Sequence, residues 1–170
     1  MTTIRPETPG DVDAIRRVNA AAFPTPLESR LVDALRAAGK ATISLVAEEA
    51  GGEVVGHILF SPVTLDPPSP GAAGLGLAPV AVVPERQSRG IGGELIRRGL
   101  ALAADAGFGF IVVLGEPAYY GRFGFVKASS FGLGNDYGVD DPFMALELLP
   151  GALAGLSGVA RYEPEFGMFE

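Results

Sequence analysis

Apolar residues recur at helical spacing in two stretches near the start of the chain. Thr8 and Asp11 form a capping-box pattern that predicts the beginning of a helix. The apolar positions of this helix are Val12, Ile15 and Val18. A second helix follows the Pro-rich break at residues 23–26 and ends at Gly39. Its apolar positions are Leu27, Leu31, Leu35 and Ala38.

The pattern then changes to runs of β-branched and apolar residues. Residues 42–48 and 53–61 flank a glycine turn and predict a β-hairpin. Residues 75–83 predict a further strand, in which Pro79 cannot donate a backbone hydrogen bond. We therefore expect a bulge, or an edge without a partner, at Pro79; an ordinary sheet edge explains this proline equally well.

A strand, helix and strand follow one another in the middle of the chain. We expect the helix over residues 91–106, ended by Gly107, and the second strand, buried, over residues 110–114. The buried face of the helix is predicted to hold Ile91, Leu95, Gly99 and Leu102. Such a unit requires a right-handed parallel crossover.

The last third of the chain contains shorter elements. A short helix is expected over residues 117–120, followed by antiparallel strands over residues 123–126 and 144–149. Residues 130–142 are rich in Gly, Asn and Asp and predict a loop. Neither an internal repeat nor an interdomain linker is visible, so we expect one domain over residues 1–170.

Composition narrows the chemistry. The chain has no Cys and one His, so it predicts neither thiolate catalysis nor a metal site built from Cys or His. We see no membrane-spanning apolar stretch and no signal-peptide pattern, and we expect a cytoplasmic protein. The formal net charge of −7 disfavours nucleic acid and anionic membrane as partners and mildly favours cationic ones, although solubility alone explains such a charge.

The segment from Val82 to Ile96 runs from a strand through a loop of cations and glycines into a helix. Such a helix start offers backbone N–H groups to an anion, and glycines let the anion approach them. A Walker A loop is excluded because Lys is missing, and a dinucleotide fingerprint is excluded because Leu95 replaces its third Gly. The predicted cofactor-binding residues of this segment are Val82, Val83, Arg86, Gln87, Ser88, Arg89, Gly90, Ile91, Gly92 and Gly93.

Three motifs carry a resemblance to a known family. Gln87-x-x-Gly90-x-Gly92 resembles the acyl-CoA pyrophosphate loop of the GNAT acetyltransferase superfamily, and residues 119–125 resemble its aromatic-Tyr-x-x-x-Gly-Phe segment. Residues 56–63, 114–117 and 150–153 resemble the YhbS-like branch of that superfamily. The resemblance implies an α/β GNAT fold, a mixed central sheet with a splayed parallel strand pair flanked by helices, and acetyl-CoA as acyl donor. It also implies that the pantetheine lies along main-chain groups near Pro79 to Val83.

The resemblance assigns a role to Tyr120, which matches the superfamily tyrosine near the cofactor sulfur and is expected to protonate the leaving thiolate; a packing role is the alternative. The general base stays open. Glu116 is a candidate that also suits a helix cap, and His57 is a candidate whose type of position more often holds a packed structural residue. Glu28 is a third candidate, or a solvated helix residue.

The implied activity is transfer of an acetyl group from acetyl-CoA to a primary amine of a small molecule or a peptide, directly within a ternary complex. A longer acyl group is one rival. The other is a CoA-binding regulatory or interaction protein with little turnover, because the strand after Leu75 has no carboxylate before Glu85. A homodimer is possible in this family, and no metal is expected.

Overall fold

The computed structural model describes residues 2–69 and 71–169, which form two compact units. The first unit comprises residues 2–61, 78–101 and 164–169, and the second comprises residues 62–69, 71–77 and 102–163. Strands β3 (Val54–Asp66) and β4 (Gly74–Val82) and helix α3 (Ile91–Asp105) contribute residues to both. One domain over the whole chain stays a prediction, and each unit is described separately.

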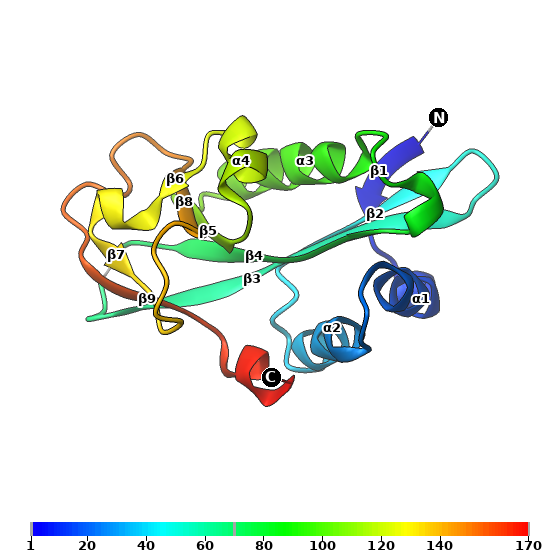
Figure 1. Cartoon of the computed structure of the whole chain (residues 1–170), viewed down its shortest axis with the longest axis horizontal. Helices are drawn as coiled ribbons and strands as arrows, with labels where there is room; N and C mark the ends of the chain where they lie inside the picture. The colour runs from blue at the N-terminus through cyan, green and yellow to red at the C-terminus, as the bar shows by residue number, and fades with distance from the viewer. Residues whose placement is uncertain (1, 70, 170) are drawn as a thin grey trace. The chain divides into compact units, whose positions relative to one another are not determined.

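In the first unit, antiparallel strands are covered on both faces. Strand β1 (Thr2–Pro6) pairs with β2 (Ile43–Glu49), and β2 pairs with β3. Helices α1 (Val12–Ala22) and α2 (Leu27–Ala37) lie on one face of these strands, and α3 lies on the other (Figure 1). The first unit also contains three short 3₁₀ helices, η1 (Pro9–Asp11), η2 (Pro84–Arg86) and η5 (Pro164–Phe169).

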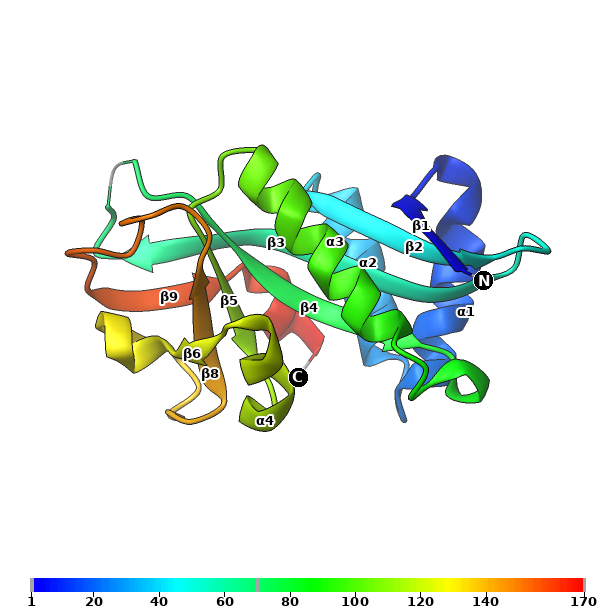
Figure 2. The same cartoon turned by 90° about the horizontal axis from the view of Figure 1, so that it is seen from above.

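Because helices cover both faces, β3 is buried without interruption from Val54 to Ser61. Alternate residues of β3 meet different helices: Gly56 packs against Ile91 and Leu95 of α3, and Leu59 joins the core with α1 and α2. Seen from above, α3 crosses the face of the strands that is opposite to α1 and α2 (Figure 2). The core on the α1 and α2 side contains Ile15, Val18, Val32, Leu35, Val46, Val54, Leu59 and Ala81.

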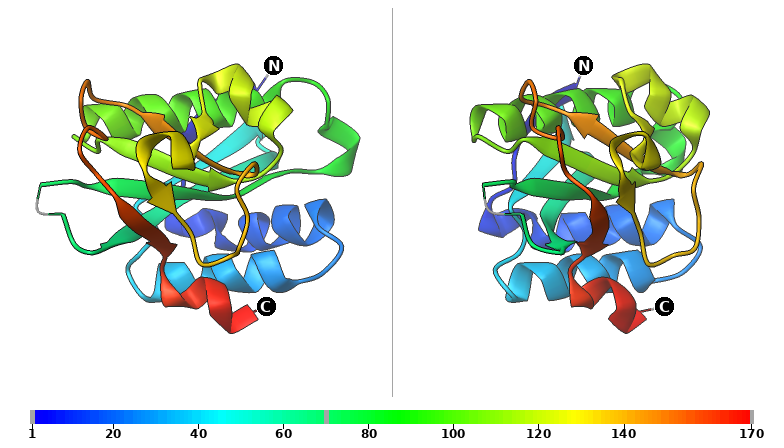
Figure 3. Two further views of the ribbon diagram at one scale, coloured as in Figure 1. Left: turned by 60° about the vertical axis from the view of Figure 1, so that its left-hand side comes forward. Right: turned by 90° about the vertical axis from the view of Figure 1, so that its left-hand side faces the viewer.

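The second unit is built around the parallel pair of β4 and β5 (Phe110–Leu114). On the far side of β5 lie β8 (Phe143–Glu147) and then β6 (Val126–Lys127), each antiparallel to its neighbour. Strand β9 (Gly158–Tyr162) runs antiparallel to the end of β3 and parallel to β7 (Leu133–Gly134), beside which it is drawn in Figure 3. The remaining elements are α4 (Pro117–Tyr120), η3 (Gly121–Phe123) and η4 (Ala128–Phe131).

The predicted mixed sheet with a parallel pair flanked by helices is confirmed. The registered pairing of β4 with β5 begins at Gly74 and ends at Leu77, opposite Val113. Strand β4 itself continues to Val82. The segment that contains Pro79 is therefore not registered with β5, as the missing proline N–H predicts.

Several element predictions require correction. Leu102 is 37% exposed, and Ala103, one residue further, takes the buried position after Gly99. Of the strand predicted over residues 123–126, Phe123 belongs to a 3₁₀ turn over residues 121–123, and the observed strand β6 is only Val126–Lys127. The loop predicted over residues 130–142 contains β7, and β3 continues to Asp66 because β9, which the sequence analysis did not predict, pairs with its end.

Candidate active site

The predicted phosphate loop is a preformed turn in the first unit. Ser88 and Gly90 both have positive φ, at 63° and 85°, a conformation that is costly for Ser and free for Gly. The Gln87 side chain donates from Nε2 to the Val82 carbonyl at 2.9 Å, and the Arg86 backbone N–H donates to the Val83 carbonyl at 2.9 Å. The loop is thus held by its own residues before any ligand arrives.

The N-terminus of α3 leaves backbone donors available. Within the described chain, the N–H groups of residues 90–93 make no hydrogen bond to another residue, whereas the Glu94 N–H donates to the Gly90 carbonyl at 3.0 Å. Unpaired N–H groups at a helix start carry partial positive charge. Ile91 is 7% exposed and anchors this end of the helix against Gly56. The arrangement suits a bound phosphate or pyrophosphate.

The two arginines of the loop differ in their surroundings. Arg86 pairs with Glu49, with its Nε 2.6 Å from Oε2 and its Nη2 3.2 Å from Oε1. The hydrogen bond to Glu49 raises the pKa of Arg86, and the same bond lowers the pKa of Glu49. Arg89 is exposed at the loop. The charge of Arg86 is therefore already compensated, a relationship that spans 37 residues and that the sequence analysis missed.

The predicted cofactor residues Val82 and Val83 are half-buried, and their backbone groups have partners. The Val83 N–H donates to the Val55 carbonyl at 2.9 Å, in addition to the bond that its carbonyl accepts from Arg86. The Val82 carbonyl accepts from Gln87. These two residues therefore shape the loop, and the groups left for an anion are those of residues 90–93.

Tyr120 of the second unit is held in an aromatic cluster. Its ring is 8% exposed and packs edge-on against Tyr119, with centroids 5.0 Å apart, and against Phe125 at 5.8 Å. Glycine is required at position 115, because a Cβ there would overlap the Tyr120 ring. Among the described residues, none makes a hydrogen bond to the Tyr120 hydroxyl, so the ring is fixed while the hydroxyl is available. Burial raises the pKa of Tyr120 to about 12, and the hydroxyl keeps its proton at neutral pH.

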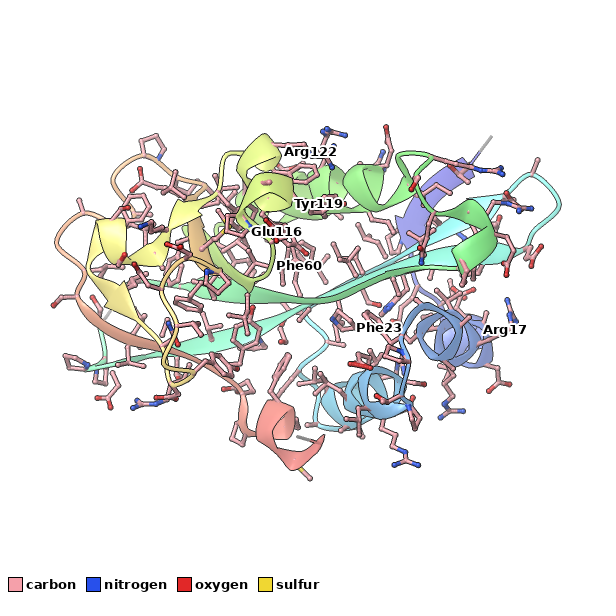
Figure 4. All side chains as sticks on the ribbon, viewed as in Figure 1. Arg17, Phe23, Phe60, Glu116, Tyr119 and Arg122 are labelled. Carbon is pink, nitrogen blue, oxygen red and sulfur yellow. The ribbon has the colours of Figure 1, made fainter. Side chains whose placement is uncertain are left out.

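Glu116 lies at the start of α4, between β5 and Tyr119. Its carboxylate accepts from the Ala118 backbone N–H at 3.4 Å and caps the helix, and the side chain is exposed. Figure 4 shows Glu116, Tyr119 and Arg122 together around α4, where the Arg122 guanidinium lies 4.6 Å from the centre of the Tyr119 ring. The cap considered for Glu116 is present, and its side chain is accessible to solvent.

His57 lies in the core of the first unit and is fully buried. Its Nε2 is 2.9 Å from Ser44 Oγ, and its Nδ1 is 3.2 Å from Asn19 Nδ2. Burial lowers the pKa of His57 to about 4, so the ring is neutral near pH 7. Both ring nitrogens are thus occupied and away from solvent, which favours the packed structural residue over the catalytic base.

The contacts of His57 continue to the surface through a chain of polar groups. Ser44 Oγ donates to Glu7 Oε1, and Glu7 accepts from Arg36 at 3.0 Å (Nε to Oε2) and 3.1 Å (Nη2 to Oε1). Since Ser44 gives its proton to Glu7, the network assigns the imidazole proton to Nε2 of His57. Asn19 donates to His57 and to the Ile15 carbonyl at 3.0 Å, as this tautomer requires. The sequence contains no spacing that predicts this network.

The other candidates are readily placed. Glu28 is half-buried in the first turn of α2, where Thr25 lies 3.5 Å from its carboxylate. In residues 2–69 and 71–169, no three His, Asp or Glu side chains are grouped as metal ligands. Over the same residues, no helix is long and apolar enough to cross a membrane.

Comparison with known proteins identifies the class. The family described as Acetyltransferase (GNAT) domain matches residues 3–128, which is more than half of the chain. Its members transfer an acyl group, and the protein is an acyltransferase by class. More narrowly, this chain belongs to the GNAT family of N-acetyltransferases.

Individual relatives agree with this assignment. The chain is 34% identical over 167 residues to the uncharacterized N-acetyltransferase YhbS of Escherichia coli K12, covering 98% of this chain and 99% of the relative. The crystal structure of Escherichia coli YhbS in complex with CoA has a TM-score of 0.93 at 32% identity, covering 99% of this chain and 93% of that one. A GNAT acetyltransferase of Brucella melitensis in complex with acetyl-CoA has a TM-score of 0.80 at 42% identity, with 98% of each chain covered. The predicted resemblance to the YhbS-like branch is confirmed.

Proposed function

We propose that this protein transfers the acetyl group of acetyl-CoA directly to a primary amine of a small molecule or a peptide. The observation that carries the proposal is the open row of N–H groups at residues 90–93, behind a loop fixed by Gln87 and by positive φ at Ser88 and Gly90. Such a row neutralises a pyrophosphate without a Walker lysine. The complexes of YhbS with CoA and of the Brucella relative with acetyl-CoA support this donor.

The reaction needs three events, and the chain supplies groups for each. A neutral amine attacks the thioester carbonyl, the C–S bond breaks, and the CoA thiolate takes up a proton. Without cysteine the chain has no thiol to carry the acetyl group, so transfer occurs in one ternary complex. We assign stabilisation of the oxyanion and contacts to the pantetheine to main-chain groups near Pro79, on the part of β4 that is not registered with β5.

Tyr120 is the proposed donor to the thiolate. A phenol of pKa about 12 keeps its proton for donation, but it is a weaker acid than an ordinary thiol in water, whose pKa is about 8.5. Donation is therefore favoured only when the thiolate is also desolvated, since burial raises the pKa of a thiolate in the same direction. The role of Tyr120 thus depends on a closed, water-poor complex.

Glu116 is the proposed base, acting on the amine directly or through one water. It is exposed and lies four residues from Tyr120, whereas His57 is buried with both ring nitrogens bonded. The formal charge of −7 agrees with an amine acceptor that arrives as a cation. We propose that the reaction takes place in the cytoplasm. We also propose a homodimer, which light scattering would test.

Calorimetric titration with acetyl-CoA, with ATP as control, tests the donor. We expect micromolar binding of acetyl-CoA, well above that of ATP. Thiol release from acetyl-CoA across a panel of small amines, amino acids, peptides with free N-termini and lysine peptides then tests turnover. Failure to bind acetyl-CoA would end the assignment. A panel of longer thioesters separates an acetyltransferase from a transferase of longer acyl groups.

One observation favours a second function, a CoA-binding regulatory protein with little turnover. No carboxylate lies on β4, and the buried His57 offers no replacement. Tight binding of CoA without thiol release for any amine would support this function. Release above the hydrolysis background with even one amine would exclude it.

A further inference from the structure

Tyr162, the last residue of β9, lies against the backbone of β4 in the second unit. A Cβ built on Gly76 would stand 2.7 Å from Cε2 and 2.9 Å from Cζ of the Tyr162 ring. Real Cβ atoms do not approach other atoms so closely, so the ring occupies the place of the side chain that residue 76 lacks. Glycine at position 76 is therefore the complement of tyrosine at position 162.

The hydroxyl of Tyr162 reaches one carbonyl on each strand of the parallel pair. It lies 3.3 Å from the Leu77 carbonyl of β4 and 3.2 Å from the Val112 carbonyl of β5. Leu77 belongs to the last registered pair of the two strands. The hydroxyl thus bridges β4 and β5 at the point where their pairing ends.

This hydroxyl is a permanent donor. Burial raises the pKa of Tyr162 far above its ordinary value. The ring packs against the hydrophobic core of the second unit, which includes Phe110, Val112 and Ala160. Tyr162 as a whole is half-buried, and the single proton of its hydroxyl is shared between the Leu77 and Val112 carbonyl oxygens. Loss of the hydroxyl would free the Leu77 and Val112 carbonyls to move apart or to take other partners.

We propose that Tyr162 is a positioning residue that fixes where the pairing of β4 with β5 ends, and thereby sets the main-chain geometry offered to the acyl-pantetheine arm. This inference rests on the proposed function, in which the arm lies along residues 79–83 of the chain. Leu77 lies two residues before that segment. The residue acts through the backbone of β4 and does not itself touch the reacting atoms.

The test compares two ligands that share the adenosine and all three phosphates of CoA and differ in possession of the arm. Acetyl-CoA carries pantetheine, and adenosine 3′-phosphate 5′-diphosphate does not, so only the former depends on Tyr162. We expect Tyr162→Phe to weaken acetyl-CoA binding about five- to tenfold and binding of the nucleotide fragment less than twofold, by calorimetry. The Michaelis constant for acetyl-CoA should rise by a similar factor.

A second variant tests the same contact by displacing the ring of Tyr162 instead of removing its hydroxyl. Gly76→Ala pushes the ring of Tyr162 away and should produce the same selective loss of acetyl-CoA. Gly134→Ala is the matched control on a strand of the same unit, because its Cβ would meet only ordinary contacts, 3.8 Å from the Gly158 carbonyl and 4.0 Å from Val159. It should leave both affinities unchanged.

The outcomes are distinct. Unchanged acetyl-CoA affinity in Tyr162→Phe, or an equal loss of both ligands in Tyr162→Phe and Gly76→Ala, would overturn the positioning role. If the wild-type chain bound no acetyl-CoA, the proposed function would fail and this inference with it. Wild-type binding together with an unaffected Tyr162→Phe would overturn the inference alone.

Discussion

The carboxylate of Glu49, at the end of β2, holds the guanidinium of Arg86 in the phosphate loop, with its Oε2 2.6 Å from Nε. The side chains are 27% and 31% exposed, so the pair is accessible to solvent but well aligned. An arginine whose charge is already compensated by a carboxylate contributes less to the binding affinity for an anion than an arginine without such a partner. The two loop arginines, treated alike in the sequence analysis, are therefore expected to contribute unequally.

Arg89→Ala should weaken acetyl-CoA binding more than Arg86→Ala does, by about tenfold against about threefold, because Arg89 is exposed while Arg86 is paired. Glu49→Gln should restore the charge of Arg86 to the loop and tighten binding slightly. Calorimetry at 50 and 200 mM salt measures all three. An Arg86→Ala effect equal to or larger than that of Arg89→Ala would contradict this order.

The preformed loop leads us to expect a larger loss of affinity from a substitution at Gly90. Gly90→Asp adds a negative side chain beside the N–H groups of residues 90–93 and should reduce acetyl-CoA affinity at least a hundredfold. Gly107→Asp is the matched control, since Gly107 also has positive φ, at 92° against 85°, and its Cβ would likewise meet nothing within 4 Å. Both variants carry the same backbone strain, so both should unfold at similar temperatures. Micromolar binding retained by Gly90→Asp would remove the phosphate-loop assignment.

Local sequence patterns predicted several of the elements near the candidate site residues. Gly107 after a run of apolar positions marked the end of α3, and Pro117 marked the start of α4, as the structure shows. Pro79 predicted a bulge or an edge without a partner, and the registered pairing of β4 with β5 ends two residues before it, at Leu77. Each of these signals acts within a few residues, where backbone conformation and the lack of a proline N–H decide the outcome.

Relationships between distant segments were out of reach. Nothing near residues 62–66 indicates that β9 will pair there, and this pairing is why β3 runs on to Asp66. The ion pair of Glu49 with Arg86 and the bonds of His57 likewise join residues from separate elements, so sequence spacing carries no trace of them. The candidate acid could be named from a motif, whereas the burial that excludes His57 from solvent is a property of tertiary packing.

Tyr120→Phe tests the proposed acid. Removing the hydroxyl keeps the ring in its cluster with Tyr119 and Phe125, so the fold and the cofactor Michaelis constant should change little. The turnover number should fall about tenfold to a hundredfold, since general acid catalysis typically contributes about that much or more. Tyr119→Phe is the control, because it loses a hydroxyl one residue away. Equal turnover numbers for Tyr120→Phe and the wild type would reject the role of Tyr120.

His57 predicts how stability depends on pH. Its pKa is about 4 in the folded chain against 6.5 for the free side chain, so between these values the unfolded chain binds a proton that the folded chain does not. The stabilisation is complete above pH 6.5 and is lost as the pH falls toward 4, with a slope approaching about 1.4 kcal/mol per pH unit. Over the whole window this amounts to about 3 kcal/mol.

Urea unfolding of the wild type and of His57→Gln at pH 7.5, 6.5, 5.5 and 4.5 measures this slope. The variant has no imidazole to titrate, so its stability should decline less than that of the wild type between pH 6.5 and 4.5, and the difference between the two curves reports His57. Glu7 and Arg36 face the same network; burial raises the pKa of Glu7, but the hydrogen bonds of Arg36 and Ser44 outweigh it and lower this pKa overall, and the Glu7 carboxylate is present in both proteins. Parallel curves for the two proteins would show that His57 is protonated in the fold near pH 6, and the catalytic base would then have to be reconsidered.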